Sequence, residues 1–115
     1  YMKRDYIQYL EDIIESINNI EEYVNGFTFN TFIEDKKTID AVIRNFEIIG
    51  EASKNIPMDI KEKYKEVPWK IMSDMRNILI HEYFGIKLDI IWKTINERLP
   101  ELKKSILNLI KDLDK

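Results

Sequence analysis

The sequence predicts an all-α protein, built as an antiparallel bundle of four or five helices. Apolar residues recur at steps of three and four along most of the chain, which is the period of a helix with one buried face. Only three glycines and three prolines interrupt 115 residues, so long helices are favoured. With 44 % apolar and 34 % charged residues, the composition is that of a globular chain. At this length, residues 1–115 are expected to form a single domain.

The first helix is expected to run from about Lys3 to Val24, where Asn25 and Gly26 supply a stop signal. Its inward stripe consists of six residues: Tyr6, Leu10, Ile13, Ile17, Ile20 and Val24. The opposite face is rich in glutamate, which we interpret as a solvated surface.

Three phenylalanines occupy the short connection that follows: Phe27, Phe29 and Phe32. We expect them to close the end of the bundle rather than to bind a ligand. The segment Thr31–Glu34 has the pattern of a capping box. It therefore predicts the start of a second long helix that continues to Ile56 and is closed by Pro57. The inward residues of this helix would be Ile39, Val42, Phe46 and Ile49.

Gly50 lies in the middle of this second helix. A glycine there costs about 1 kcal/mol relative to alanine. A close helix crossing would explain that cost, either inside the bundle or across a dimer.

The second half of the chain is expected to contain a charged short helix or turn at residues 59–66, followed by two further helices. Pro68 suits the first position of the third helix, whose core side would carry Trp69, Met72, Met75 and Leu79. A fourth helix would start within residues 85–89 and present Ile91, Trp92, Ile95 and Leu99 to the core. Pro100 should break or kink it. The last piece, to about Leu113, would bury Leu102, Ile106, Leu109 and Leu113.

Three chemically distinct polar residues lie close together near the end of the third helix: Arg76, His81 and Tyr83. Arg76 and Tyr83 are almost two helical turns apart, so they share a face. His81, the only histidine of the chain, joins that face only if the helix ends or loosens near it. Gly85 follows where a helix stop is expected. We therefore place His81 in the last turn.

This trio suits cleavage of an RNA phosphodiester. An arginine fork grips phosphate oxygens, a histidine exchanges protons near neutral pH, and a tyrosine offers a ring on which a base stacks. In that scheme the 2′-hydroxyl attacks phosphorus and loses its proton, and no metal is required. A purely structural interpretation stays open, in which His81 lies at the negative pole of a helix dipole and Tyr83 is an ordinary core-edge residue. Arg76 would then pair with Glu47 or Glu51.

Arg44, Glu47 and Glu51 fall on one face of the second helix at helical spacing. They form either a surface ladder of ion pairs or the border of a cleft around Arg76. The sequence does not decide between these two interpretations.

Residues Arg76 to Tyr83 resemble the signature of the HEPN superfamily: an arginine, four to six residues, a histidine, any residue and a tyrosine. Asn77 fits as well, because a polar residue often follows that arginine. More narrowly, the chain resembles the HepT toxins of toxin–antitoxin pairs, in the blocks at residues 41–52, 68–69 and 99–102. The resemblance covers nearly the whole chain.

The resemblance implies a homodimer in which two copies of the motif face each other across one cleft and cleave RNA. Arg76 would grip the scissile phosphate and His81 would act as general base or acid. Asn77 would orient a phosphate oxygen or His81, and Tyr83 would position the RNA. It further implies a partner, a minimal nucleotidyltransferase antitoxin, which silences the toxin by attaching AMP to Tyr83.

Charge and composition limit the other possibilities. The formal net charge is −3 and the sequence pI is about 5.3, so RNA binding must depend on a local cationic patch. Its candidate members are Arg76, Lys70, Lys87 and Lys93. Without cysteine, disulfides and thiolate metal sites are excluded. No apolar run reaches the roughly 18–20 residues of a membrane span, and we expect a cytoplasmic protein without metal or cofactor.

Two other classes of function remain open at this point. The first is a non-catalytic helical dimer that binds a nucleotide or the antitoxin through the same motif. The second is a structural dimer in which Arg76 and His81 are buried in ion pairs.

Overall fold

The computed structural model describes the backbone of residues 3–81 and 87–114, and the side chains of residues 6–76 and 87–114. The helices, in chain order, are α1 (Lys3–Tyr23), α2 (Phe29–Glu34), α3 (Lys36–Lys54), α4 (Met58–Lys63), α5 (Trp69–His81), α6 (Leu88–Lys93) and α7 (Leu99–Leu113), with a π-helical turn at Thr94–Arg98 between the last two. This part of the chain contains no strand, which confirms the all-α prediction.

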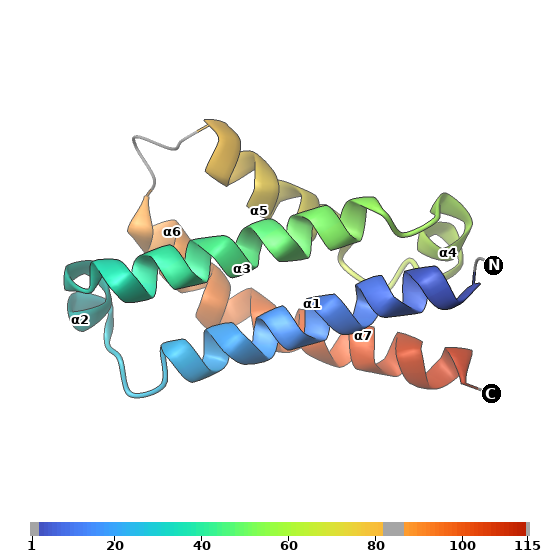
Figure 1. Ribbon diagram of the computed structural model, residues 1–115, viewed down its shortest axis with the longest axis horizontal. Coiled ribbons are helices and arrows are strands. Elements are labelled where there is room, and N and C mark those ends of the chain that lie inside the picture. The colour runs from blue at the N-terminus through green and yellow to red at the C-terminus, as the bar shows by residue number, and fades with distance from the viewer. Residues whose placement is uncertain (1–2, 82–86, 115) are drawn as a thin grey trace.

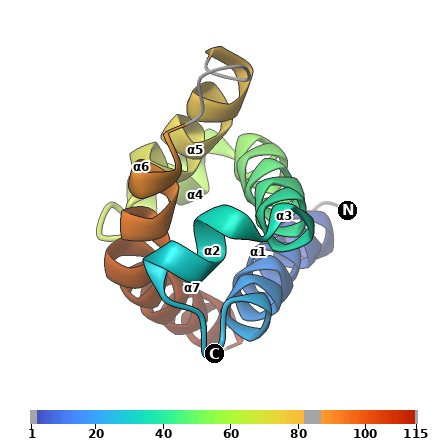
Figure 2. The same ribbon diagram turned by 90° about the vertical axis from the view of Figure 1, so that its left-hand side faces the viewer.

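The long helices run side by side around one core (Figure 1), and the fold measures 44 × 28 × 22 Å. Viewed along the bundle, α1, α3, α5 and α6–α7 surround that core, and α2 crosses its end (Figure 2). The inward stripes predicted for the first, second and last helices are buried or partly buried in the structure. No helix in the described ranges is both long and apolar enough to cross a membrane.

The prediction of one second helix from Thr31 to Ile56 is wrong, because the chain forms α2 and α3 with a break at Asp35. The capping box lies three residues earlier than predicted, with Thr28 as the N-cap of α2 and Thr31 as its third residue. Asp35 then caps α3 by accepting a hydrogen bond from the backbone N–H of Thr38. A competing cap thus divides the predicted helix.

The short α2 closes one end of the bundle, as predicted for its phenylalanines. Phe32 is fully buried, and its ring centroid lies 5.1 Å from that of Trp92. Phe29 lies 6.4 Å from the same ring. These aromatic contacts join α2 to α6, two elements far apart in the sequence.

Pro100 is accommodated by the π-helical turn that precedes it. The backbone N–H of Leu99 bonds to the carbonyl of Thr94, five residues back. In a regular α-helix, the proline ring would collide with the carbonyl four residues before it. The wider turn makes room for the ring, and the ribbon changes direction between α6 and α7 (Figure 1).

The helix boundaries just before α5 agree closely with those predicted from the sequence. Helix α4 occupies the segment where a short helix or turn was predicted. Pro68 directly precedes α5, one residue outside the predicted position, and Trp69, Met72 and Met75 face the core. Leu79, predicted to do the same, has a side chain outside the described residues.

Tyr64 ties the connection between α4 and α5 to the far end of the chain. Its hydroxyl donates a hydrogen bond to the carboxylate of Asp112 on α7. That bond, with burial and the negative charge of Asp112 adding to it, raises the pKa of Tyr64 to about 12. The folded protein therefore holds the phenol proton to higher pH than the unfolded chain does.

We expect this link to make the protein sensitive to alkali between about pH 10 and 12. The stability that it contributes is fully present below the ordinary tyrosine pKa of 10.0 and is lost as the pH rises through the folded value. In urea unfolding at stepped pH, Tyr64→Phe should flatten the decline of stability across this window. Tyr23→Phe, at an exposed tyrosine, is the control and should keep the wild-type slope. Equal slopes in all three proteins would contradict the assignment.

Candidate functional site

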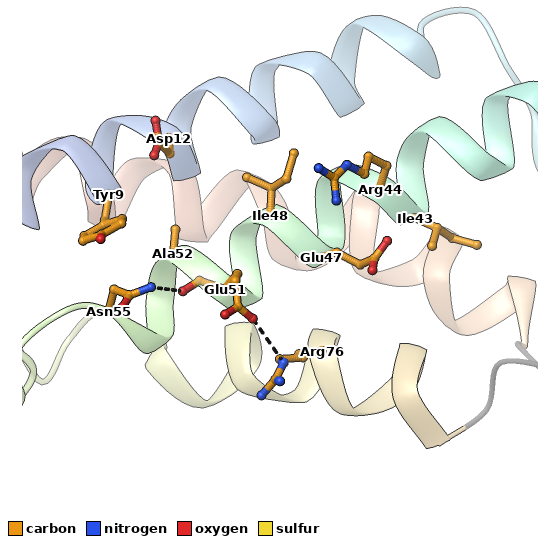
Figure 3. Close-up of a pocket in the computed structure, with 10 residues that line it drawn as sticks. All are labelled: Tyr9, Asp12, Ile43, Arg44, Glu47, Ile48, Glu51, Ala52, Asn55 and Arg76. Atoms are coloured by element: carbon orange, nitrogen blue, oxygen red, sulfur yellow. Dashed lines mark hydrogen bonds and ion pairs between the residues drawn. The ribbon is translucent and has the colours of Figure 1, made fainter.

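A pocket of about 720 Å³ lies along the outer face of α3, between α1 and α5 (Figure 3). Helix α3 supplies six of the ten lining residues, Ile43, Arg44, Glu47, Ile48, Glu51 and Ala52, and its C-cap residue Asn55 supplies a seventh. Tyr9 and Asp12 come from α1, and Arg76 comes from α5. The structure therefore brings Arg44, Glu47 and Glu51 to the same pocket as Arg76.

Helix α5 packs closely against α3 at Gly50. A Cβ atom added to this glycine would lie 2.8 Å from the Cβ atom of Arg76 and 3.4 Å from the carbonyl oxygen of Met72. The first distance is shorter than real Cβ atoms tolerate, so only glycine fits this crossing without a shift. The close crossing suggested by the sequence is thus found inside the bundle. It determines the position of the Cβ atom of Arg76 relative to α3.

The side chain of Arg76 forms an ion pair with Glu51 across the two helices. Its Nε atom lies 3.4 Å from Oε2 of Glu51 (Figure 3). The two side chains are 41 % and 58 % exposed, so solvent screens the pair and it adds at most about 1 kcal/mol to stability. Glu51 thus pairs across to α5 instead of extending a ladder along α3. Arg76 remains accessible to a ligand.

His81 is the last described residue of α5, so the residues that decide whether it lies in the final turn are outside the described range. The side chains of Asn77 and His81, and all of Tyr83, lie outside the described residues. Seen along the bundle, the end of α5 stands away from the other helices (Figure 2).

Charge in the pocket is mixed. Asp12, Glu47 and Glu51 supply three carboxylates, against the two guanidinium groups of Arg44 and Arg76. Anion binding there must depend on the local field of an arginine, because the lining as a whole does not attract anions.

The lysines proposed for a cationic patch contribute unevenly. Lys70 lies 3.1 Å from Asp74 on its own helix, which offsets its charge. Lys87 and Lys93 are both exposed, the first as the N-cap of α6 and the second as its last residue. Within the described ranges, no group of three histidine, cysteine or acidic side chains is placed to hold a metal ion.

Sequence reasoning missed Tyr9, Asp12 and Asn55 as pocket residues. Tyr9 and Asp12 lie beside the inward stripe of α1, and nothing in the apolar period marks them. Their place depends on which edges of α1 and α3 meet, which is a property of the packing.

Comparison with known proteins adds independent information. The sequence model of the family described as "Ribonuclease HepT-like" matches residues 13–109. A protein of Thermococcus cleftensis named "Probable ribonuclease HepT" is 54 % identical over 102 residues, which cover 89 % of this chain and 93 % of that protein. No solved structure matches the chain.

Methanocaldococcus jannaschii has several similar proteins, and two of them illustrate the range of lengths. One, named "Putative RNase", is 46 % identical over 112 residues, covering 97 % of this chain and 93 % of that protein. The other, named "Gamma-glutamylcyclotransferase and putative RNase", is 47 % identical over 114 residues, covering 99 % of this chain. The present chain spans about half the length of this second relative, 51 %.

Proposed function

The chain belongs to the HepT-like ribonuclease family, and we propose that it is an endoribonuclease that cleaves RNA phosphodiesters without a metal ion. The observation that carries this proposal is the position of Arg76. It is a half-exposed arginine at a pocket, on the same helix as His81. A permanent cation and a titratable base on one helix are the two groups that this reaction needs.

In the proposed reaction, the 2′-oxygen of the RNA attacks phosphorus as the bond from phosphorus to the 5′-oxygen breaks. His81 accepts the 2′-hydroxyl proton or delivers a proton to the leaving 5′-oxygen. Arg76 binds the phosphate and stabilises the extra negative charge of the pentacoordinate state. Asn77 would orient a phosphate oxygen or His81, and Tyr83 would position the RNA. The products are a 2′,3′-cyclic phosphate and a 5′-hydroxyl.

The second candidate is a non-catalytic dimer that binds a nucleotide or an antitoxin. The pocket beside Arg76 favours it, since about 720 Å³ lies within the usual size of small-ligand sites. This candidate predicts binding of RNA or nucleotide without cleavage, so the same assay separates the two.

Cleavage of RNA in the presence of EDTA should depend on both motif residues. Arg76→Ala and His81→Ala should each lower the rate about 10²- to 10³-fold or more, as the loss of a charge-stabilising donor or a general base does. Gel assays with end-labelled RNA measure the rate. Thermal melting should show folded proteins, because the exposed ion pair of Arg76 contributes little to stability.

Ser73→Ala is the matched control for that assay, since it lies exposed on the same helix and should cleave at the wild-type rate. Wild-type cleavage by Arg76→Ala or His81→Ala would rule out the assigned roles. If EDTA stopped cleavage and Mg²⁺ restored it, the metal-independent scheme would be wrong.

We further propose that the active form is a homodimer with two motifs facing one cleft. One arginine and one histidine are few groups for phosphodiester cleavage, and a two-fold axis doubles both. Light scattering at micromolar concentration should therefore give twice the mass of one chain, 13.9 kDa. A monomer that retains activity would contradict this proposal.

Control of the activity is proposed to reside in Tyr83. A nucleotidyltransferase antitoxin would transfer AMP from ATP to its phenol, releasing pyrophosphate. The new phosphodiester carries a negative charge that Arg76 can bind in place of the RNA backbone, and the adenosine would fill the cleft.

Incubation with the partner enzyme and ATP should add AMP to Tyr83, as peptide mass spectrometry would show. Tyr83→Phe should escape both modification and silencing. Tyr23→Phe is the matched control, because Tyr23 is exposed whereas Tyr6 and Tyr64 are each only 7 % exposed. Modification of another tyrosine with equal silencing would refute this mechanism.

A further inference from the structure

Two consecutive residues of α3 contact opposite ends of the same side chain on α5. Gly50 lies against the Cβ atom of Arg76, and Glu51 lies against its Nε atom. One contact sets where the side chain begins, and the other sets where its guanidinium group lies.

The contact at Gly50 is steric. The Cβ atom of Arg76 on α5 lies 2.8 Å from the position that a Cβ atom on Gly50 would occupy. Any larger residue at position 50 must push α5 away from α3. Because the obstacle is the first atom of the Arg76 side chain, rotation of that side chain does not relieve the clash.

The contact at Glu51 is electrostatic and directional. Its carboxylate lies 3.4 Å from Nε, and the two terminal nitrogens of Arg76 lie on the side away from Glu51 (Figure 3). Those terminal nitrogens form a fork that matches two phosphate oxygens. Binding at Nε therefore leaves this fork facing outward.

We propose that Gly50 and Glu51 are positioning residues for Arg76, which hold its terminal fork ready for the phosphate of the RNA. The role of this positioning in catalysis rests on the proposed function, whereas the contacts of Gly50 and Glu51 with Arg76 do not depend on it. The carboxylate also offsets the charge of Arg76 and so weakens RNA binding before the reaction. Glu51 thus orients Arg76 but weakens the binding of RNA. Its removal should therefore strengthen RNA binding and slow cleavage.

Kinetics on RNA should separate these two effects. Gly50→Ala should lower kcat about 10- to 100-fold, because a shift of about 1 Å at a reacting group has that cost. Glu51→Ala should lower kcat about tenfold and also lower KM, since the offsetting charge is gone. Glu51→Gln retains an oxygen acceptor for Nε, so its kcat should stay within about threefold of wild type while KM falls.

Two controls isolate the positioning role from general loss of stability or charge. Ile49→Val trims a fully buried neighbour of Gly50 and should lower the melting temperature without lowering kcat. Glu62→Gln removes an exposed carboxylate from α4 and should leave kcat and KM unchanged. If Ile49→Val lowered kcat as much as Gly50→Ala at the same melting temperature, the positioning role would be refuted.

A second readout does not depend on cleavage. The Nε–Hε signal of Arg76 in an NMR spectrum, identified by its loss in Arg76→Lys, reports directly on the contact with Glu51. Glu51→Ala and Gly50→Ala should both move it toward the position of free arginine, whereas Ile49→Val should not. If neither variant moved the signal, the inference would be overturned even in an active enzyme. If the signal moved but the wild type cleaved no RNA, the proposed function would fail and the holding of Arg76 would stand.

Discussion

The close crossing of α3 and α5 is the constraint on which the candidate site depends. A Cβ atom at Gly50 would lie 2.8 Å from that of Arg76, so the missing side chain sets the distance between the two helices. This distance brings Arg76 to the edge of the pocket along α3 and within reach of Glu51. A mid-helix glycine that costs about 1 kcal/mol in helix propensity is thereby explained by the position of one arginine.

Different forces hold different parts of this arrangement. Met72 and Met75 are essentially fully buried on the inner side of α5, and their removal would cost about 2–5 kcal/mol each. They anchor the helix to the core. The ion pair at Arg76 is half exposed and contributes at most about 1 kcal/mol, so it orients a side chain without holding the fold. One helix therefore holds both buried residues that stabilise the fold and an exposed residue that serves the proposed chemistry. A substitution of the exposed residue should leave the protein folded.

Much of the fold could be predicted because one physical signal, the apolar period, determines it. The stripes of α1, α3 and α7 were correct almost residue for residue. Local capping was harder to predict, because Thr31 is the third residue of a capping box that begins at Thr28, and Asp35 then caps a separate helix. The pocket was only partly predictable. Helical spacing placed Arg44, Glu47 and Glu51 on one face, but the contribution of Tyr9 from α1 depends on how two helices pack.

The most direct measurement is a crystal structure of the protein with a short RNA that carries a 2′-deoxy substitution at the cleavage site. Without the attacking hydroxyl, the RNA should stay intact in the site. The scissile phosphate should lie on the two terminal nitrogens of Arg76, with Nε still beside Glu51 and α5 still against Gly50. An RNA whose phosphate binds elsewhere, or an Arg76 that turns away from Glu51 to reach it, would contradict the proposed role of Arg76.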